Sequence, residues 1–99
     1  MAEVHVATLV VPVALSRVDA LAVIALAVEG QVVGAFTPDA HVPLPDGARA
    51  YVEIPRFGDP PPFAIDVESE GGAGASRLAA EDLARRLRAS TGWEIHQDF

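Results

Sequence analysis

Residues 63–99 of this chain, FAIDVESEGGAGASRLAAEDLARRLRASTGWEIHQDF, decide its fold class. Apolar and polar side chains alternate from Phe63 to Glu68 and again from Trp93 to Phe99, which is typical of strands with one buried face. Between these strands the sequence predicts a helix over 76–91, with Ser76 as N-cap and Gly92 as its left-handed stop. The glycine-rich residues 70–75 are predicted to be a flexible lead-in. The stretch therefore indicates an α+β domain, and it contains no catalytic motif.

The predicted helix has an apolar face and a charged face. With successive residues about 100° apart, its small apolar side chains fall within one arc of roughly 140°. Two i,i+4 pairs, Glu81–Arg85 and Asp82–Arg86, each favour the helix by about 0.2–0.5 kcal/mol. Trp93 directly follows the helix stop, so we expect it to be buried under the leucines of the apolar face. The arc contains Ala79, Ala80, Leu83, Ala84 and Leu87.

The first third of the chain has no clear polar face, so its hydrophobic pattern fits more than one secondary structure. Val4–Val13 is rich in β-branched residues and apolar on both faces, which is typical of a central strand. Ser16–Glu29 fits a helix that starts at a Ser16 cap and stops at Gly30, but large apolar residues surround its helical wheel. It also fits a strand that turns at Glu29-Gly30 into the next strand. Both alternatives leave apolar surface uncovered, which suggests a homodimer.

The middle of the chain predicts two further strands and two proline-rich loops. The strands are Gln31–Phe36 and Arg49–Pro55, and the loops are Thr37–Ala48 and Arg56–Pro62. With a helix at 17–29 the order is β-α-β-β-β-α-β, a variant of the ferredoxin-like topology. With a hairpin there, the chain forms a β-meander plus one helix. Both are two-layer folds with a mainly antiparallel sheet of four to six strands over one domain, residues 1–99.

Composition excludes several chemistries. The chain has no cysteine and no lysine, so thiol catalysis, thiolate metal sites and Schiff bases are impossible. Its net charge of −7 is unsuited to binding a phosphate backbone, so we expect no nucleic-acid partner. The apolar run Ala20–Val28 is too short to span a bilayer, and the acidic Met-Ala-Glu start does not resemble a secretory signal. We therefore expect a cytoplasmic protein without a membrane partner.

One polar cluster is a weak candidate site. Alternation predicts that Glu94, His96 and Asp98 share one face of the last strand, where a histidine between carboxylates could bind a metal or act as a base. A solvated strand face explains the same pattern, and the spacing is too wide for one ion, so no metal or cofactor is predicted. His5 is expected to be a hydrogen-bonded core or interface histidine. His41, in a proline-rich loop, is expected to be exposed.

The strongest candidate for a partner contact is the pair Arg56 and Phe57. Arginine and aromatic residues dominate binding hot spots, and the prolines that follow would stiffen the loop that presents them. The competing interpretation places Phe57 on the core.

These observations predict a small acidic protein with a non-enzymatic role. The leading hypothesis is a protein–protein interaction or accessory, inhibitor-type module, because no catalytic cluster accompanies the excess of apolar surface. The alternative is a small enzyme or ligand-binding protein with a cavity at a homodimer interface, using His5, Tyr51 or His96 as its polar group. A deep pocket that contains one of these three would favour the alternative.

Overall fold

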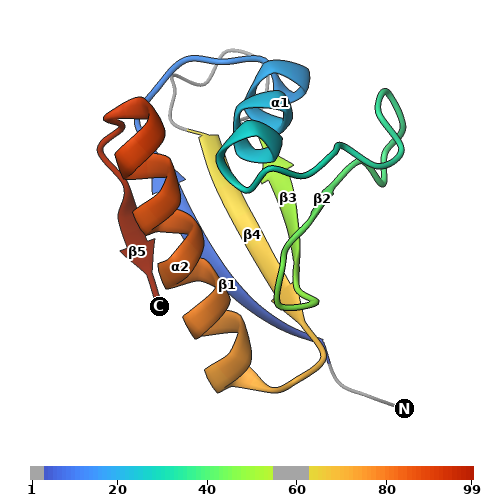
Figure 1. Ribbon diagram of the computed structural model, residues 1–99, viewed down its shortest axis with the longest axis vertical. Helices are drawn as coiled ribbons and strands as arrows, with labels where there is room; N and C mark the ends of the chain where they lie inside the picture. Colours follow the sequence, from blue (N-terminus) through green and yellow to red (C-terminus); the bar gives the residue numbers. More distant parts are fainter. Residues whose placement is uncertain (1–3, 55–62) are drawn as a thin grey trace.

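The computed structural model describes residues 4–54 and 63–99, and it shows an α+β fold of five strands and two helices (Figure 1). Residues 4–54 contain β1, α1, β2 and β3, and residues 63–99 contain β4, α2 and β5. Their bounds are β1 His5–Val11, α1 Arg17–Ala27, β2 Val42–Pro43, β3 Arg49–Glu53, β4 Phe63–Ser69, α2 Ala73–Thr91 and β5 His96–Asp98.

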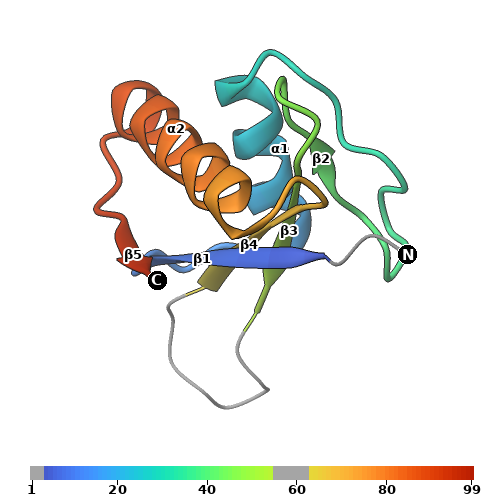
Figure 2. The same ribbon diagram turned by 90° about the horizontal axis from the view of Figure 1, so that it is seen from below.

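The strands form one antiparallel sheet in the order β2-β3-β4-β1-β5. Helix α1 leads from β1 to β2, which are separated in the sheet by β3 and β4. Helix α2 leads from β4 to β5, which are separated by β1. Both helices cover the same face of the sheet, as Figure 2 shows. The observed order β-α-β-β-β-α-β is the ferredoxin-like alternative, and the β-meander is excluded.

Strand β1 is an interior strand, as its apolar composition predicts. Ala7, Leu9 and Val11 are buried beneath the helices. Neither helix of the described residues covers the opposite face, where Val6 is exposed although it is apolar. The two-sided apolar pattern therefore correctly indicated an interior position, but only one of its faces is covered by helices.

Segment 17–27 is a helix, and the backbone groups at both of its ends have hydrogen-bonding partners. The Ser16 hydroxyl accepts a hydrogen bond from the Asp19 amide at 3.1 Å, as an N-cap does. At the other end the Gly30 amide donates to Ala25 O (2.8 Å) and the Glu29 amide donates to Leu26 O (3.3 Å), the two bonds of a Schellman motif. The left-handed residue is Glu29, with φ 55°, so the prediction that Gly30 supplies the helix stop was wrong.

The predicted strand Gln31–Phe36 is wrong. Only Val33 pairs, in an isolated bridge with His41, because Gly34 (φ 68°) and Phe36 (φ 67°) turn the chain away from the sheet. The edge strand is instead β2, inside the segment predicted to be a loop. In Figure 1 the segment between α1 and β2 projects beyond the sheet.

Helix α2 starts three residues earlier than predicted. Gly72, at φ 102°, makes the turn into the helix, and the small residues Ala73 to Ala75 form its first turn. Ser76 is not the cap: it is buried inside the helix and its hydroxyl donates to Ala73 O at 2.9 Å. Gly92 ends the helix in the left-handed conformation, as predicted. Neither helix of the described residues combines the length and the apolar character that a membrane span requires.

The last strand is shorter than the predicted range 93–99. Trp93 precedes β5 and is partly buried, and its ring meets Phe63 edge-on with centroids 5.6 Å apart. Ile95 is buried, whereas Phe99 is exposed and does not join it in the core. The alternation therefore holds for Trp93 and Ile95 but fails at the last residue of the chain.

Candidate functional site: an apolar groove beside helix α1

The candidate site is a groove of about 480 Å³ between α1 and the segment that follows it. We call it the α1 groove. Its walls are almost entirely apolar, with Arg17 as the one charged residue among them. The lining residues are Arg17, Val18, Leu21, Ala22, Val32, Ala35, Phe36, Thr37, Pro38 and Ala40.

Helix α1 supplies one wall of the groove. Its inner face, including Leu21 and Ile24, is buried in the core, which fixes the rotation of the helix. That rotation turns Val18 and Ala22 outward, where both are exposed. The outer side of α1 is therefore apolar, because the sequence places no polar face on this helix.

The projecting segment 34–40 supplies the other wall, and hydrogen bonds hold it in place. Val33 and His41 close its base with two backbone bonds, at 2.8 and 3.1 Å. The Thr37 amide and hydroxyl both donate to Gly34 O, at 3.0 and 2.6 Å. Arg17 Nη2 donates to Pro38 O at 2.8 Å and so ties the loop to the first turn of α1. The groove is thus preorganised rather than formed by a free loop.

Phe36 is the most unusual residue of the groove. Its side chain is 85% exposed, and its backbone lies in the left-handed region with φ 67°. For a residue with a side chain this conformation costs about 1–2 kcal/mol relative to the right-handed one. Strain of this kind concentrates at functional sites and binding segments. A strained backbone that leaves a phenyl ring in water contributes little to folding.

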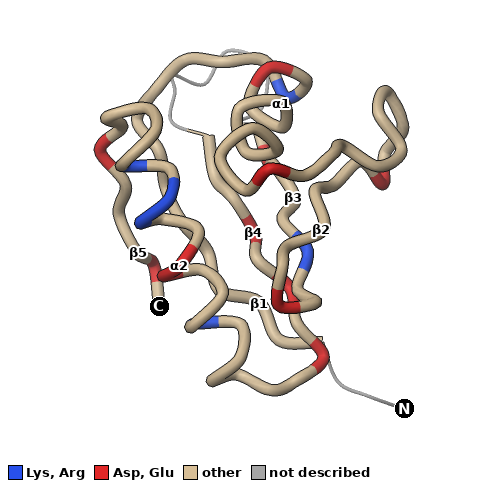
Figure 3. The backbone as a smooth tube through the Cα atoms, in the orientation of Figure 1, with Lys and Arg blue, Asp and Glu red and all other residues tan. Residues whose placement is uncertain are grey.

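The surroundings of the α1 groove are acidic. Asp19 follows Val18 on the helix, Asp39 follows Pro38 in the loop, and Glu29 terminates α1. Figure 3 shows acidic residues at both ends of α1 and on the projecting loop, with a basic residue also at the start of α1, and most of the other basic residues on α2. Nη2 of the Arg17 guanidinium donates to Pro38 O. Nε of the same group is buried with no hydrogen-bond partner among the described residues. The groove therefore combines apolar walls with a negatively charged rim.

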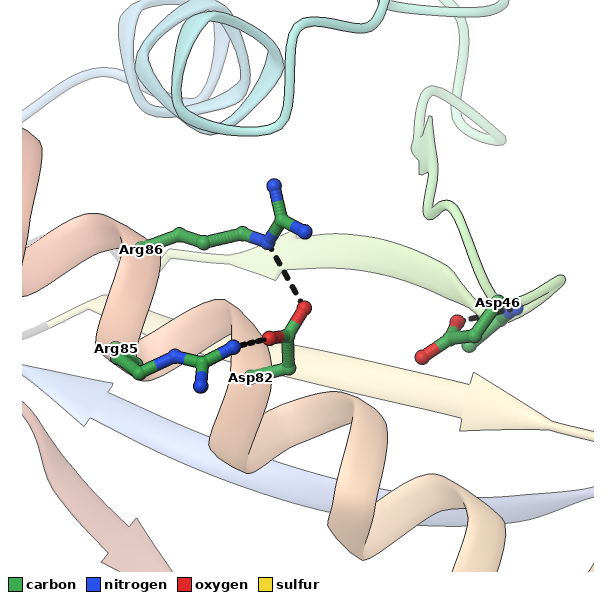
Figure 4. A network of polar contacts seen from close by, with 5 residues as sticks. Asp46, Asp82, Arg85 and Arg86 are labelled. Carbon is green, nitrogen blue, oxygen red and sulfur yellow. Dashed lines mark hydrogen bonds and ion pairs between the residues drawn. The ribbon is translucent and has the colours of Figure 1, made fainter.

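Helix α2 carries the charged cluster drawn in Figure 4, away from the groove. Asp82 accepts from Arg86 Nε at 2.8 Å and also pairs with Arg85. The hydrogen bond from Arg86, with the charges of both arginines, holds the pKa of Asp82 below its usual value. The predicted Asp82–Arg86 pair is confirmed, whereas Arg85 pairs with Asp82 rather than with Glu81. The cluster stabilises the exposed side of α2 and lines no part of the α1 groove.

The predicted polar site lies at the opposite, open face of the sheet. Glu94 precedes β5, and its Oε1 lies 3.1 Å from His96 Nε2, with both side chains mostly exposed. Asp98 pairs across the sheet with Thr8, whose hydroxyl donates to Asp66 Oδ1 at 2.8 Å. Within the described ranges no group of three or more His, Asp or Glu side chains is arranged to hold a metal ion. The arrangement is that of a solvated sheet face.

The other predicted residues do not line the groove either. His5 is partly buried opposite Ser69, at the start of β1. His41 was expected to be exposed, but it is partly buried: its ring stacks on Tyr51 with centroids 5.1 Å apart. Nδ1 of His41 lies 2.8 Å from the Asp39 carbonyl oxygen, so Nδ1 carries the proton and donates. Arg56 and Phe57 lie outside the described residues.

Sequence reasoning missed Phe36 and Arg17. It assigned Phe36 to a strand, and it interpreted the residues around Arg17 only as the start of a helix. Two signals were present: Gly34 inside the supposed strand, and the missing polar face of α1. Comparison of the chain with known protein families, with curated proteins and with solved structures finds no match.

Proposed function

We propose that this protein is a non-enzymatic interaction module whose α1 groove binds an apolar segment of another protein, flanked by lysine or arginine. The observation that carries the proposal is Phe36: an 85% exposed aromatic ring on a left-handed backbone, at the lip of a tethered apolar groove. Aromatic residues are common anchors of protein–protein interfaces, and a preorganised anchor lowers the ordering cost of binding.

A protein segment fits this groove better than a small molecule does. A volume of about 480 Å³ lies within the range of ligand pockets. Phe36, however, projects so far into solvent that a small molecule in the groove would leave most of the ring uncovered. A larger partner can fill the groove and cover the ring together. None of His5, Tyr51 and His96 lines the groove, so the groove does not contain the polar groups expected for the alternative, a cavity at a homodimer interface.

Charge selects the partner. Asp19 and Asp39 adjoin the lining residues Val18 and Pro38 in the sequence, Arg17 is the one basic residue of the lining, and the whole chain carries −7. A partner with lysine or arginine beside its apolar residues would gain from this field. A second copy of the chain, which the sequence suggested as a homodimer, would bring a second negative rim against the first. We therefore favour a basic partner, and the experiment below distinguishes the two.

The test is a selection from a phage-displayed random peptide library against the immobilised protein, followed by affinity measurements on the enriched peptides. We expect enriched sequences with apolar residues beside lysine or arginine. Burying the Phe36 ring is worth about 1.5–3 kcal/mol, so Phe36→Ala should weaken binding at least tenfold. Ala22→Asp should do the same by placing a charge in the groove. Leu78→Ala is the matched control, because Leu78 is 69% exposed on α2 and outside the groove.

Three outcomes would reject the proposal. The first is the absence of any sequence that is enriched on the wild-type protein relative to Ala22→Asp. The second is a set of peptides that bind Phe36→Ala as tightly as the wild type. The third is a dimer mass in light scattering that returns to the monomer value in Phe36→Ala, since that would make a second copy the occupant.

A further inference from the structure

The outward side of α1 extends the groove along the helix. Val18, Ala22 and Leu26 are spaced four residues apart and therefore lie in one row, all exposed, with Leu26 at 80%. The row spans roughly 12 Å, or about two helical turns. Ala22 is a low point between two larger side chains, so another backbone can approach closely there. We infer that the occupant of the α1 groove is an amphipathic helix that packs antiparallel to α1; this inference rests on the proposed function.

Hydrogen bonding favours a helix over an extended segment. The backbone of α1 is bonded within the helix, and the loop wall uses its amides at Val33, Thr37, Ala40 and His41 in bonds of its own. An extended peptide in the groove would therefore bury main-chain groups that find few partners. A helix satisfies its own main chain and presents only side chains, as in helix-in-groove recognition. An apolar surface built on a helix is thus suited to a helical partner.

Charge determines the direction of the bound helix. The last turn of α1 carries the negative end of its dipole, and Glu29 adds a carboxylate there. The positive N-terminal end of a bound helix is stabilised at that point. At the other end, where a bound antiparallel helix has its last turn, the two carboxylates of Asp19 and Asp39 outnumber the guanidinium of Arg17. Lysine and arginine are favourable in a last turn, so the basic flank of the partner belongs at its C-terminal end.

The test uses the tightest peptide from the library selection and a variant of that peptide with proline at its central residue. Proline breaks a helix but is compatible with an extended segment, so the variant should bind at least tenfold more weakly. The wild-type peptide should also gain helical circular dichroism on binding. Leu26→Asp in the protein should weaken binding, whereas Leu78→Asp, a matched change on α2, should not.

Direction is measured by nitroxide labels on either end of the same peptide. A label at the N-terminal end should broaden the amide signals of residues 26–30, and a label at the C-terminal end those of residues 17–19. The reversed pattern would reject the antiparallel arrangement. Equal affinity for the proline variant would reject the helix and leave the proposed function intact. If the selected peptide instead binds Phe36→Ala as tightly as the wild type, the proposed function itself is rejected.

Discussion

Phe36 and Phe63 are chemically identical residues that the structure predicts to have opposite effects on stability. Phe36 is 85% exposed with φ 67°, whereas Phe63 is 2% exposed and packs edge-on against Trp93. Replacing Phe36 with glycine removes a left-handed strain of about 1–2 kcal/mol. Glycine also raises the conformational entropy of the unfolded chain, which costs about 0.5–1 kcal/mol of stability. The substitution further loses the small buried part of the ring, worth a few tenths of a kcal/mol, whereas full burial of the ring is worth roughly 1.5–3 kcal/mol.

The free energy of unfolding of Phe36→Gly should therefore stay within about 1 kcal/mol of the wild type, on the stabilising side. For a domain of this size, 1 kcal/mol corresponds to about 4–8 °C in melting temperature. Phe63→Ala should instead cost about 3–5 kcal/mol, because it opens a cavity in the core. The assay is urea denaturation monitored through Trp93, the one tryptophan of the chain.

Trp93 supplies an independent readout. Its native emission should change in Phe63→Ala, since the ring contact is lost, and should remain unchanged in Phe36→Gly. Peptide binding should respond in the opposite way to tryptophan emission: Phe36→Gly should lose affinity for the peptide while its fold stays intact. Destabilisation of Phe36→Gly as large as that of Phe63→Ala would show that the ring of Phe36 is part of the core, and the case for the groove as a docking site would lose its main observation.

Three further predictions concern the loop, the helix ends and the charged cluster. Arg17→Ala removes the bond to the loop and should speed amide hydrogen exchange in residues 34–39 while costing at most about 1–3 kcal/mol; unchanged exchange would contradict the tether. Glu29→Gly should raise stability and Gly92→Ala should lower it, each by about 1 kcal/mol in urea, because both positions are left-handed; equal signs would refute the strain argument. Asp82, whose pKa is lowered by Arg86, stabilises the folded state above the carboxyl pKa of the unfolded chain, about 3.9, and this contribution is lost as pH falls through the lower folded pKa. Asp82→Asn should therefore cost at most about 1 kcal/mol at pH 7, and its difference from the wild type should vanish in acid.

Much of the fold follows from local patterns that are visible in the chain. The alternation in 63–68 and 49–53 indicated strands because successive side chains in a strand point to opposite faces. Ser16 and Gly92 marked helix ends because a serine oxygen satisfies a first-turn amide and glycine adopts the left-handed conformation without strain. The apolar residues of β1 indicated an interior strand. Each of these inferences needs only neighbours a few residues apart.

The tertiary structure alone decided segment 17–41 and the candidate site. Whether 17–27 forms a helix or a hairpin depends on what covers its apolar residues, and that is the sheet. The groove depends on two contacts between distant residues: the Val33–His41 bridge and the bond from Arg17 to Pro38, 21 positions away. Local propensity favoured a strand at 31–36, but backbone groups pair with whichever partners the folded chain brings within reach. Here the chain turns at Gly34 and Phe36, so the loop closes on itself and on α1, and the phenyl ring is left in solvent.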